Sequence, residues 1–267
     1  MGFARTISET LGPVVDMVYP PRCPACGEGI GEQSGLCPSC WEDLAIPAQP
    51  WCALCQRPFG DAVVEDGAIC APCMAEPPRH AGIAAGTLYT DTARKLVLAF
   101  KHGRRIALAP LLAKLISAKL GEPDRRQVII PVPLHRWRLW RRGFNQAGLL
   151  AREIERLGHG TLAVDALVRR KATPSLGGLG AKARRRALAG AIGLTEKGKS
   201  TVIGRDIVLL DDVLTSGATS DACVTVLRRG GAKSVRIACF ARVLNEIDSR
   251  DYVPNETPEA VTASGAT

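Results

Sequence analysis

Four C-x-x-C pairs lie in the first third of the chain, and their spacing is typical of zinc ligands. Eight of the ten cysteines form these pairs: Cys23/Cys26, Cys37/Cys40, Cys52/Cys55 and Cys70/Cys73. A C-x-x-C turn places two thiolates on one side of a tight backbone reversal, and two such turns complete a tetrahedral S₄ site. The pairs therefore predict two zinc ions in two zinc ribbons. Consecutive and interleaved pairing would use the same eight residues, so the sequence leaves the pairing open.

A disulfide framework and C-x-x-C redox chemistry are the alternatives for these cysteines. Disulfides need an exporting signal, and the first twenty residues, which include Glu9 and Asp16, lack the compact apolar segment of one. Redox motifs rarely come as four tandem pairs. Structural zinc and a cytoplasmic location are therefore expected, with the metal supplying folding free energy to a segment poor in large apolar side chains. Cys223 and Cys239 stand singly in apolar contexts and are expected to be buried, without a functional role.

A second group of chemically capable residues follows an apolar run. In DIVLLDDVLTSGATSDACVTVLRR (206–229), four apolar residues precede Asp211 and Asp212, and a small-residue turn then leads into a helix. The turn consists of Thr215, Ser216, Gly217, Ala218 and Thr219. A strand, such a turn and a helix N-terminus aim several N–H groups and a positive dipole at one point, which suits a phosphate. The carboxylates could then accept hydrogen bonds from sugar hydroxyls or help hold Mg²⁺.

The plainer interpretation of this segment is a βα turn whose Asp and Thr residues merely cap the helix. An Asp-Asp pair on its own would not favour a ligand site over that plainer interpretation. The combination of buried strand, acidic pair, small-residue turn and helix favours a ligand site, because ligands of open α/β sheets bind at the carboxyl edge of the strands.

Positive charge is concentrated in the middle of the chain. The formal net charge is +9, but residues 94–186 hold 22 Lys/Arg against five Asp/Glu, and residues 1–80 carry a net −6. So dense an excess predicts a surface that faces phosphates of a small ligand, of nucleic acid or of both, whereas a solvated face is the alternative. No apolar run approaches the length of a transmembrane helix.

Short apolar runs that alternate with amphipathic stretches must position these residues, and they predict an α/β domain with a mainly parallel sheet. Strands are expected at 83–89, 127–133, 164–169, 207–212 and 234–241, helices at 91–101, 106–120, 145–157 and 218–229, and a long basic loop at 134–144. The expected organisation is an N-terminal helix (1–20), a Cys-rich double zinc ribbon (21–76), the α/β domain (81–244) and a disordered tail (245–267).

LLDDVLTSGAT (209–219) resembles the signature with which type I phosphoribosyltransferases bind phosphoribosyl pyrophosphate (PRPP). The C-x-x-C pairs, LVLAFKHGRRIALA (96–109) and IIPVPLHRWRLWRRGFNQA (129–147) extend the likeness, over roughly residues 15–243, to the ComF family. That family joins a zinc-ribbon segment to a phosphoribosyltransferase-like domain and is associated with DNA uptake in transformable bacteria. The resemblance implies a type I phosphoribosyltransferase-like fold that binds PRPP with Mg²⁺.

The resemblance also implies roles for individual residues. Asp211 and Asp212 would contact the ribose hydroxyls directly or through Mg²⁺, Thr215 to Thr219 would hold the 5′-phosphate, and Arg141, Arg142 and Lys101 would neutralise pyrophosphate. His135 is a candidate proton handler or a loop-packing residue. One segment departs from the family pattern: Leu176, Ala187 and Ile192 stand where Gln, Asn and Phe are usual, although Arg169 is kept. The departure puts in doubt any acceptor-specific role there.

Two functions of different class follow from this pattern. One is a phosphoribosyltransferase with an unidentified acceptor. The other is a nucleic-acid-associated module of the DNA-uptake machinery, with single-stranded DNA and a competence helicase as partners, in which PRPP binding is regulatory or vestigial. Trp137, Trp140 and Phe144 among arginines favour the second, because aromatic rings stack on bases while arginines hold phosphates. The two tryptophans lie three residues apart, so packing on one helical face is the alternative for them.

Overall fold

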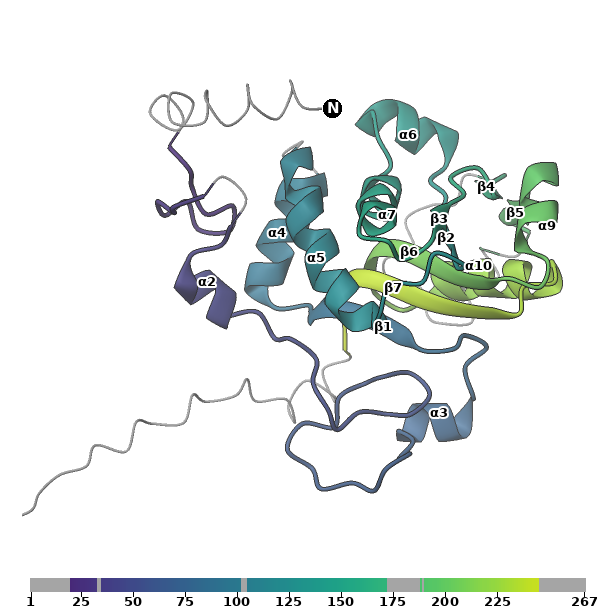
Figure 1. Ribbon diagram of the computed structural model, residues 1–267, viewed down its shortest axis with the longest axis horizontal. Coiled ribbons are helices and arrows are strands. Elements are labelled where there is room, and N and C mark those ends of the chain that lie inside the picture. Colours follow the sequence, from purple (N-terminus) through teal and green to yellow (C-terminus); the bar gives the residue numbers. More distant parts are fainter. Residues whose placement is uncertain (1–19, 33–34, 102–104, 172–187, 189, 245–267) are drawn as a thin grey trace, which may run out of the picture.

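A five-stranded parallel sheet is the centre of the molecule (Figure 1). The computed structural model describes residues 20–32, 35–101, 105–171, 188 and 190–244. The strands follow the order β1-β7-β6-β2-β3, and every neighbouring pair is parallel. Their bounds are β1 (Ile83–Leu88), β2 (Val128–Pro131), β3 (Thr161–Leu162), β6 (Asp206–Leu214) and β7 (Ser234–Arg242). The predicted mainly parallel α/β fold is confirmed.

Helices cover one face of this sheet, and they begin and end close to the predicted bounds. They are α4 (Asp91–Lys101), η1 (Ile106–Leu108) with α5 (Ala109–Leu120), and α7 (Gln146–Arg156). Phe100, Ile116 and Ile154 from these helices pack with Val208 and Leu210 of β6. Since side chains alternate along a strand, a strand covered on both faces is apolar at consecutive positions, which explains the run Ile207 to Leu210.

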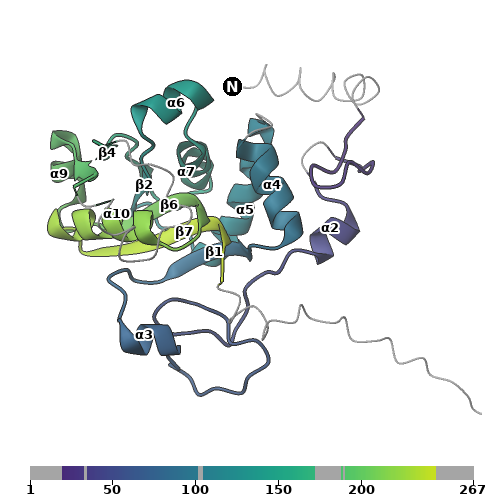
Figure 2. The same cartoon turned by 180° about the vertical axis from the view of Figure 1, so that it is seen from behind.

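The other face is shared between α10 (Ala218–Arg229) and the second cysteine-rich ribbon (Figures 1 and 2). Val224 and Leu227 of α10 pack in the same core as Ile207 and Leu209. The four cysteines of residues 52–73 belong to that core as well, together with Ile83 and Ile237. Cys223 and Cys239 are also buried in it, as expected. The second ribbon is therefore packed against the sheet.

Each ribbon is built from short pieces. An isolated β-bridge joins Arg22 to Gly29 in the first and Trp51 to Pro58 in the second. One turn of helix follows in each, α2 (Pro38–Glu42) and α3 (Ala71–Ala75), and each begins directly after a cysteine.

The segment 134–144, predicted as a loop, contains a helix, and that prediction is wrong. Helix α6 spans Arg136–Arg142. His135 caps its first turn by accepting a hydrogen bond at Nδ1 from Trp137 N–H (3.3 Å), and Gly143 ends it with a φ of 82°. A side-chain cap and a left-handed glycine are the standard helix ends, and they outweigh the weak apolar periodicity of the segment.

Three short elements have no counterpart in the prediction. These are β3, β5 (Ile192–Leu194) and α9 (Glu196–Val202). The strand predicted at 164–169 is the shorter β4 (Leu167–Arg169), which pairs with β5 as an antiparallel hairpin outside the main sheet. The predicted N-terminal helix and C-terminal tail lie outside the described residues. None of the helices in the described ranges combines the length and apolar character that crossing a bilayer would require.

Candidate functional site

A cavity of about 530 Å³ opens at the carboxyl edge of β2 and β6. It brings together most of the predicted ligand residues: Lys101, Asp211, Asp212, Thr215, Ser216, Gly217, Ala218 and Thr219. Because these residues come from α4, from β6 and from the turn before α10, the fold itself assembles the site. A crevice at this edge is where open α/β sheets bind ligands.

Strand β6 and the turn after it shape the floor of this cavity. The strand continues past the acidic pair to Leu214, so both carboxylates lie within it. Gly217 follows with a φ of 73°, a left-handed conformation that favours glycine, and α10 begins at Ala218. The first N–H groups of a helix have no acceptor within the helix. The start of this twelve-residue helix therefore supplies anion-binding donors to the cavity.

The two carboxylates have different environments. Burial, with the negative charge of Asp212 as the second cause, raises the pKa of Asp211 to about 7. Its Oδ1 accepts from the N–H of Asp212 (2.9 Å). Asp212 instead forms an ion pair with Nζ of Lys101 at 3.1 Å. Near neutral pH the cavity thus holds one carboxyl close to its titration point and one paired carboxylate.

The opposite wall of the cavity comes from the end of β2 and the start of α7. Val132, Pro133 and Leu134 line it, followed by Asn145 and Gln146. Asn145 caps α7 by accepting from the N–H of Ala147 (3.1 Å), and it donates to the carbonyl of Val132 (3.2 Å). The P-V-P-L-H and R-G-F-N-Q motifs therefore meet beside the acidic pair, which explains why both belong to one signature.

Tyr89, Arg169 and Ser220 are among the lining residues that were not assigned to the ligand site from the sequence. Arg169 is the most informative, since a cation that is only 7% exposed lines a cavity floored by carboxylates. From the sequence, Arg169 was noted only as a position kept in the family pattern. The segment 172–187 that follows it closely lies outside the described residues. Its place beside β6 depends on the β4–β5 hairpin, which was not predicted.

The predicted pyrophosphate residues Arg141 and Arg142 lie on α6, and their side chains are outside the described part of the structure. His135 has a structural role as the N-cap of α6. The aromatic residues of this region separate into two kinds. Phe144 packs against Phe100, with ring centroids 6.5 Å apart, so its proposed stacking on bases is not supported. Trp137 and Trp140 are 59% and 82% exposed, so more than half of each side chain is open to solvent.

The eight paired cysteines form two compact clusters of four. One contains Cys23, Cys26, Cys37 and Cys40, the other contains Cys52, Cys55, Cys70 and Cys73, and within each all Sγ atoms lie within 4.8 Å of one another. The pairing is therefore consecutive. Four sulfurs at about 2.3 Å from a zinc ion stand about 3.8 Å apart. The distances from Cys26 to Cys37 (3.5 Å) and from Cys55 to Cys70 (3.7 Å) fit this geometry.

Backbone N–H groups around the thiols also suit a metal site. Burial alone would raise the pKa of Cys52, but N–H groups of Cys70, Cys55 and Leu54 outweigh it and lower that pKa to about 6. The N–H of Cys70 donates to Cys52 Sγ at 3.3 Å. Four thiols and matching donors fit zinc at each cluster, and those residues would hold it as a structural ion.

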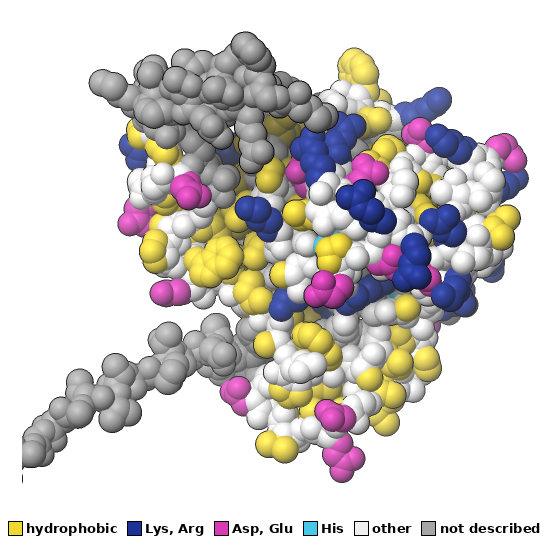
Figure 3. Space-filling model, in the orientation of Figure 1, with side chains coloured by type: hydrophobic (Ala, Val, Ile, Leu, Met, Phe, Trp, Pro, Cys, Tyr) yellow, Lys and Arg dark blue, Asp and Glu magenta, His cyan; other side chains and the backbone are white. Residues whose placement is uncertain are grey.

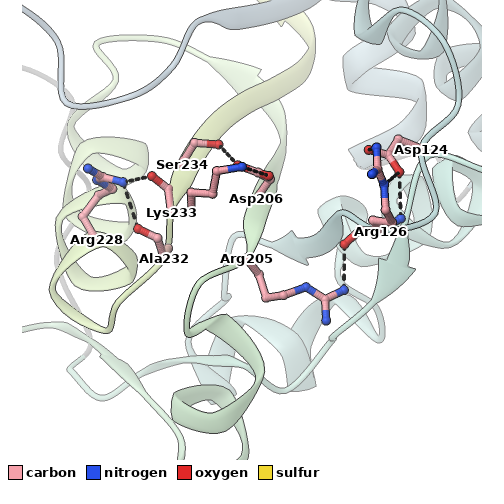
Figure 4. Close-up of polar contacts among 8 residues, drawn as sticks. All are labelled: Asp124, Arg126, Arg205, Asp206, Arg228, Ala232, Lys233 and Ser234. Atoms are coloured by element: carbon pink, nitrogen blue, oxygen red, sulfur yellow. Dashed lines mark hydrogen bonds and ion pairs between the residues drawn. The ribbon is translucent and has the colours of Figure 1, made fainter.

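The surface charge is distributed unevenly. In the view of Figure 3, Lys and Arg side chains gather over the α/β part, while the second ribbon carries Asp and Glu at its outer edge. Several cations of the α/β part have structural partners at the amino edge of the sheet (Figure 4). Lys233 pairs with Asp206 (3.1 Å), and Arg205 donates to the carbonyl of Arg126 (2.7 Å). These cations hold the strand starts, on the edge remote from the cavity.

Comparison with known proteins agrees with both parts of the molecule. Residues 14–74 match the double zinc ribbon domain, and residues 110–263 match the phosphoribosyl transferase domain. The DNA utilization protein YhgH of Escherichia coli K12 is 31% identical over 229 residues, which cover 79% of this chain and 98% of that protein. The YhgH protein of Escherichia coli O157:H7 is 32% identical over the same coverage.

Two further relatives carry competence names. Competence protein F of Haemophilus influenzae is 29% identical over 83% of this chain and 96% of its own length. Competence protein ComFC of Bacillus subtilis is 28% identical over 75% of this chain and 81% of its own length. The order of the two domains, the paired cysteine clusters and this likeness over most of both chains place the protein in the ComF family.

Proposed function

We propose that the cavity binds PRPP together with Mg²⁺. The observation that carries this proposal is the convergence, in one cavity, of two adjacent carboxylates on β6 and a left-handed turn that opens α10. A ligand with a phosphate at one end and sugar hydroxyls beside it matches that arrangement, since helix N-termini bind phosphates and carboxylates accept hydrogen bonds from hydroxyls.

Each residue then has a definite task. Thr215 to Thr219 hold the 5′-phosphate through N–H and hydroxyl donors, and Asp211 and Asp212 accept from the ribose hydroxyls. A magnesium ion at these carboxylates would neutralise pyrophosphate charge. Lys101 reaches the same place from α4, because its Nζ lies 3.1 Å from Asp212. Arg169, buried at the wall, adds a second fixed cation.

The reaction class that suits this site is displacement of pyrophosphate. The bond between the anomeric carbon and the pyrophosphate oxygen breaks, pyrophosphate leaves with the electron pair, and an acceptor atom forms the new bond to that carbon. Positive charge developing on the sugar and negative charge on the leaving group are stabilised electrostatically, by carboxylates on one side and cations on the other. No protein nucleophile is required. The acceptor is the unassigned partner of this reaction.

Calorimetric titration with PRPP in Mg²⁺ tests the binding step. The wild-type protein is expected to bind, and Asp211→Asn combined with Asp212→Asn is expected to abolish binding. Asp206→Asn is the matched control, because Asp206 begins the same strand and pairs with Lys233 and Ser234 far from the cavity. Absence of binding by the wild type, or equal loss in the control, would contradict the proposal. Release of pyrophosphate with an added acceptor, lost in the double variant, would establish the enzyme.

The second candidate function is a nucleic-acid-associated module of DNA uptake, and the exposed tryptophans of α6 favour it. Trp140 is 82% exposed on a helix whose sequence, RWRLWRR, contains four arginines. Aromatic rings displayed among arginines suit single-stranded DNA. The names of the relatives, DNA utilization protein and competence protein, support this cellular setting. A cytoplasmic location and a competence helicase as partner belong to the same proposal.

Fluorescence anisotropy with a labelled single-stranded oligonucleotide tests this second function. Trp137→Ala and Trp140→Ala are expected to weaken binding, whereas Trp41→Ala, at a tryptophan 49% exposed on the first ribbon, serves as control. If the double Asp211/Asp212 variant keeps both DNA binding and DNA uptake, PRPP binding is not the activity that the cell uses. Equal effects of all three tryptophan substitutions would argue against a site on α6.

A further inference from the structure

Arg242, the last residue of β7, joins the second cysteine cluster to the sheet. Its side chain is buried, at 7% exposure. Nη1 donates to the carbonyl of Cys55 (2.7 Å), and Nη2 donates to Cys55 Sγ (3.5 Å). One guanidinium thus holds both the backbone and the sulfur of a predicted zinc ligand. Arginine suits this task because its planar fork presents two parallel donors.

A buried guanidinium needs a counter-charge. Among the ion pairs of the described residues, none joins Arg242 to a carboxylate. A zinc ion with four thiolates carries a net charge of about −2, so the second cluster supplies the missing charge. The first cluster differs: in the described part of the chain no arginine hydrogen bond to its sulfurs is found, and Cys26 is exposed.

The backbone of Arg242 leads from this contact to the ligand cavity. Its carbonyl accepts from the N–H of Tyr89 (2.9 Å), and the next residue, Val243, donates to the carbonyl of Leu214 (2.8 Å). Tyr89 and Leu214 both line the cavity. Leu214 ends β6, directly before the turn proposed to hold the phosphate. Two parallel hydrogen bonds, one from Arg242 and one from Val243, therefore join the strand end that carries the zinc-ligand contact to the rim of the site.

We propose that Arg242 is the counter-ion of the second zinc centre and a positioning residue for the cavity. Zinc in the second ribbon then fixes the guanidinium, and through it the ends of β7, β1 and β6 at the ligand-binding edge. In the described part of the chain, no arginine joins the first zinc centre to the cavity edge in this way. The part of this proposal that concerns the ligand rests on PRPP binding as proposed above, whereas the part that concerns zinc retention does not.

Arg236 offers a matched control on the same strand. It lies six residues earlier on the strand and is also partly buried. It donates to Oε1 of Gln56 (3.3 Å), the residue after Cys55, and to the carbonyls of Lys119 and Leu120. Arg236 therefore links the same ribbon to the α/β part without touching a thiol. A general loosening of this interface would appear in Arg236→Gln as well.

Zinc release from the zinc-loaded full chain, followed with a chromogenic chelator, tests the first part. Wild-type protein is expected to release its two ions in two phases, and Cys26→Ser identifies the phase of the first centre. Arg242→Gln should accelerate only the other phase, by about 10- to 100-fold, the range for loss of a group that supports a metal ligand. Arg242→Lys, which keeps the charge and loses the fork, should fall between Arg242→Gln and wild type, and Arg236→Gln should release like wild type.

Titration of the same zinc-loaded variants with PRPP and Mg²⁺ tests the second part. Arg242→Gln should bind more weakly than wild type although Arg242 does not line the cavity, and Arg236→Gln should bind normally. Unchanged zinc release in Arg242→Gln, or equal acceleration in Arg236→Gln, would overturn the proposal. If Arg242→Gln does not fold, release from Arg242→Lys at the wild-type rate overturns it. If wild-type protein binds no PRPP, the proposed function fails while the zinc-release result still decides the role of Arg242.

Discussion

Replacing Asp211 with asparagine is expected to stabilise the ligand-free protein, and the gain should grow with pH. The carboxyl of Asp211 is held at a pKa of about 7, against an ordinary value of 3.8, first by burial and then by the charge of Asp212. Asparagine has nearly the same shape, and its oxygen can still accept from the N–H of Asp212. The substitution therefore removes the cost of an ionised group while keeping the hydrogen bond.

The sign and size of the effect follow from the two pKa values. Below about pH 4 the carboxyl is protonated in the folded and unfolded states alike, so the substitution changes little. Between about pH 4 and 7 only the unfolded chain ionises, and the free energy of unfolding of the wild type falls as the pH rises. The full difference of about three pKa units corresponds to at most about 4 kcal/mol. Partial access of water reduces it, and we expect about 2 kcal/mol, or roughly 4–8 °C in the unfolding midpoint.

Thermal unfolding of the zinc-loaded protein at pH 5, 6, 7 and 8 measures this gain. Asp206→Asn is the control, because the pKa of Asp206 is shifted in the opposite direction. Hydrogen bonds from Ser234 and Lys233 lower the pKa of Asp206, so its ionised form favours folding above about pH 4 and its loss should not stabilise the protein at any of these values. An Asp211→Asn midpoint that equals the wild-type midpoint at pH 8, or a gain that is the same at pH 5 and pH 8, would refute the reasoning.

Three other predictions concern the zinc centres, the turn and α6. Cys52→Ser should lower the unfolding midpoint more than Cys26→Ser, because Cys52 is fully buried in the core under the sheet and Cys26 is exposed. Intact-mass measurement should show two zinc ions in the wild-type protein. Gly217→Ala should lower the free energy of unfolding by about 1–2 kcal/mol because of the left-handed backbone alone. The added Cβ would meet Asp221 at an ordinary contact distance of 3.6 Å. Chemical denaturation measures this loss of stability. Trp140→Ala should leave the unfolding midpoint unchanged within error, because the side chain is exposed. It should weaken single-stranded DNA binding by about 1–3 kcal/mol in anisotropy titrations. A lowered midpoint would mean that the Trp140 ring packs against the rest of the protein.

The main sheet and its helices were predictable because their patterns are local. Residues 207–210 form a continuous apolar run, which is the mark of a strand buried on both faces, and the structure places them in β6 between two layers. The cysteine clusters were predictable for a related reason, since ligand type and spacing within each C-x-x-C turn are fixed by the metal. Their pairing was not, because it depends on how two distant turns meet.

Features that depend on contacts between distant segments escaped prediction. Helix α6 is short. It begins at the side-chain cap of His135 and ends at the left-handed backbone of Gly143, and a hydrophobic pattern reveals neither of these. Arg169 reaches the cavity because β4 pairs with β5, more than twenty residues later in the chain. The partner of Arg242 is Cys55, 187 residues away, and neither residue has a local pattern that points to the other.

The position of the second ribbon bears on how the two halves of the molecule act together. Helices α4, α5 and α7 cover one face of the sheet. On the other face α10 packs with Val202 of α9 and with the β4–β5 hairpin, and the cysteines of the second cluster complete that layer over Ile83 and Ile237. A sheet with β1 and β7 uncovered would expose apolar side chains to water, at a cost of about 25 cal/mol per Å². The second ribbon thus covers the part of the sheet that a helix would otherwise cover. Because it does so next to Arg242, loss of its zinc would disturb the core and the cavity edge together. The first ribbon packs elsewhere, with Ala25 and Leu36 against the core on the face covered by α4, α5 and α7.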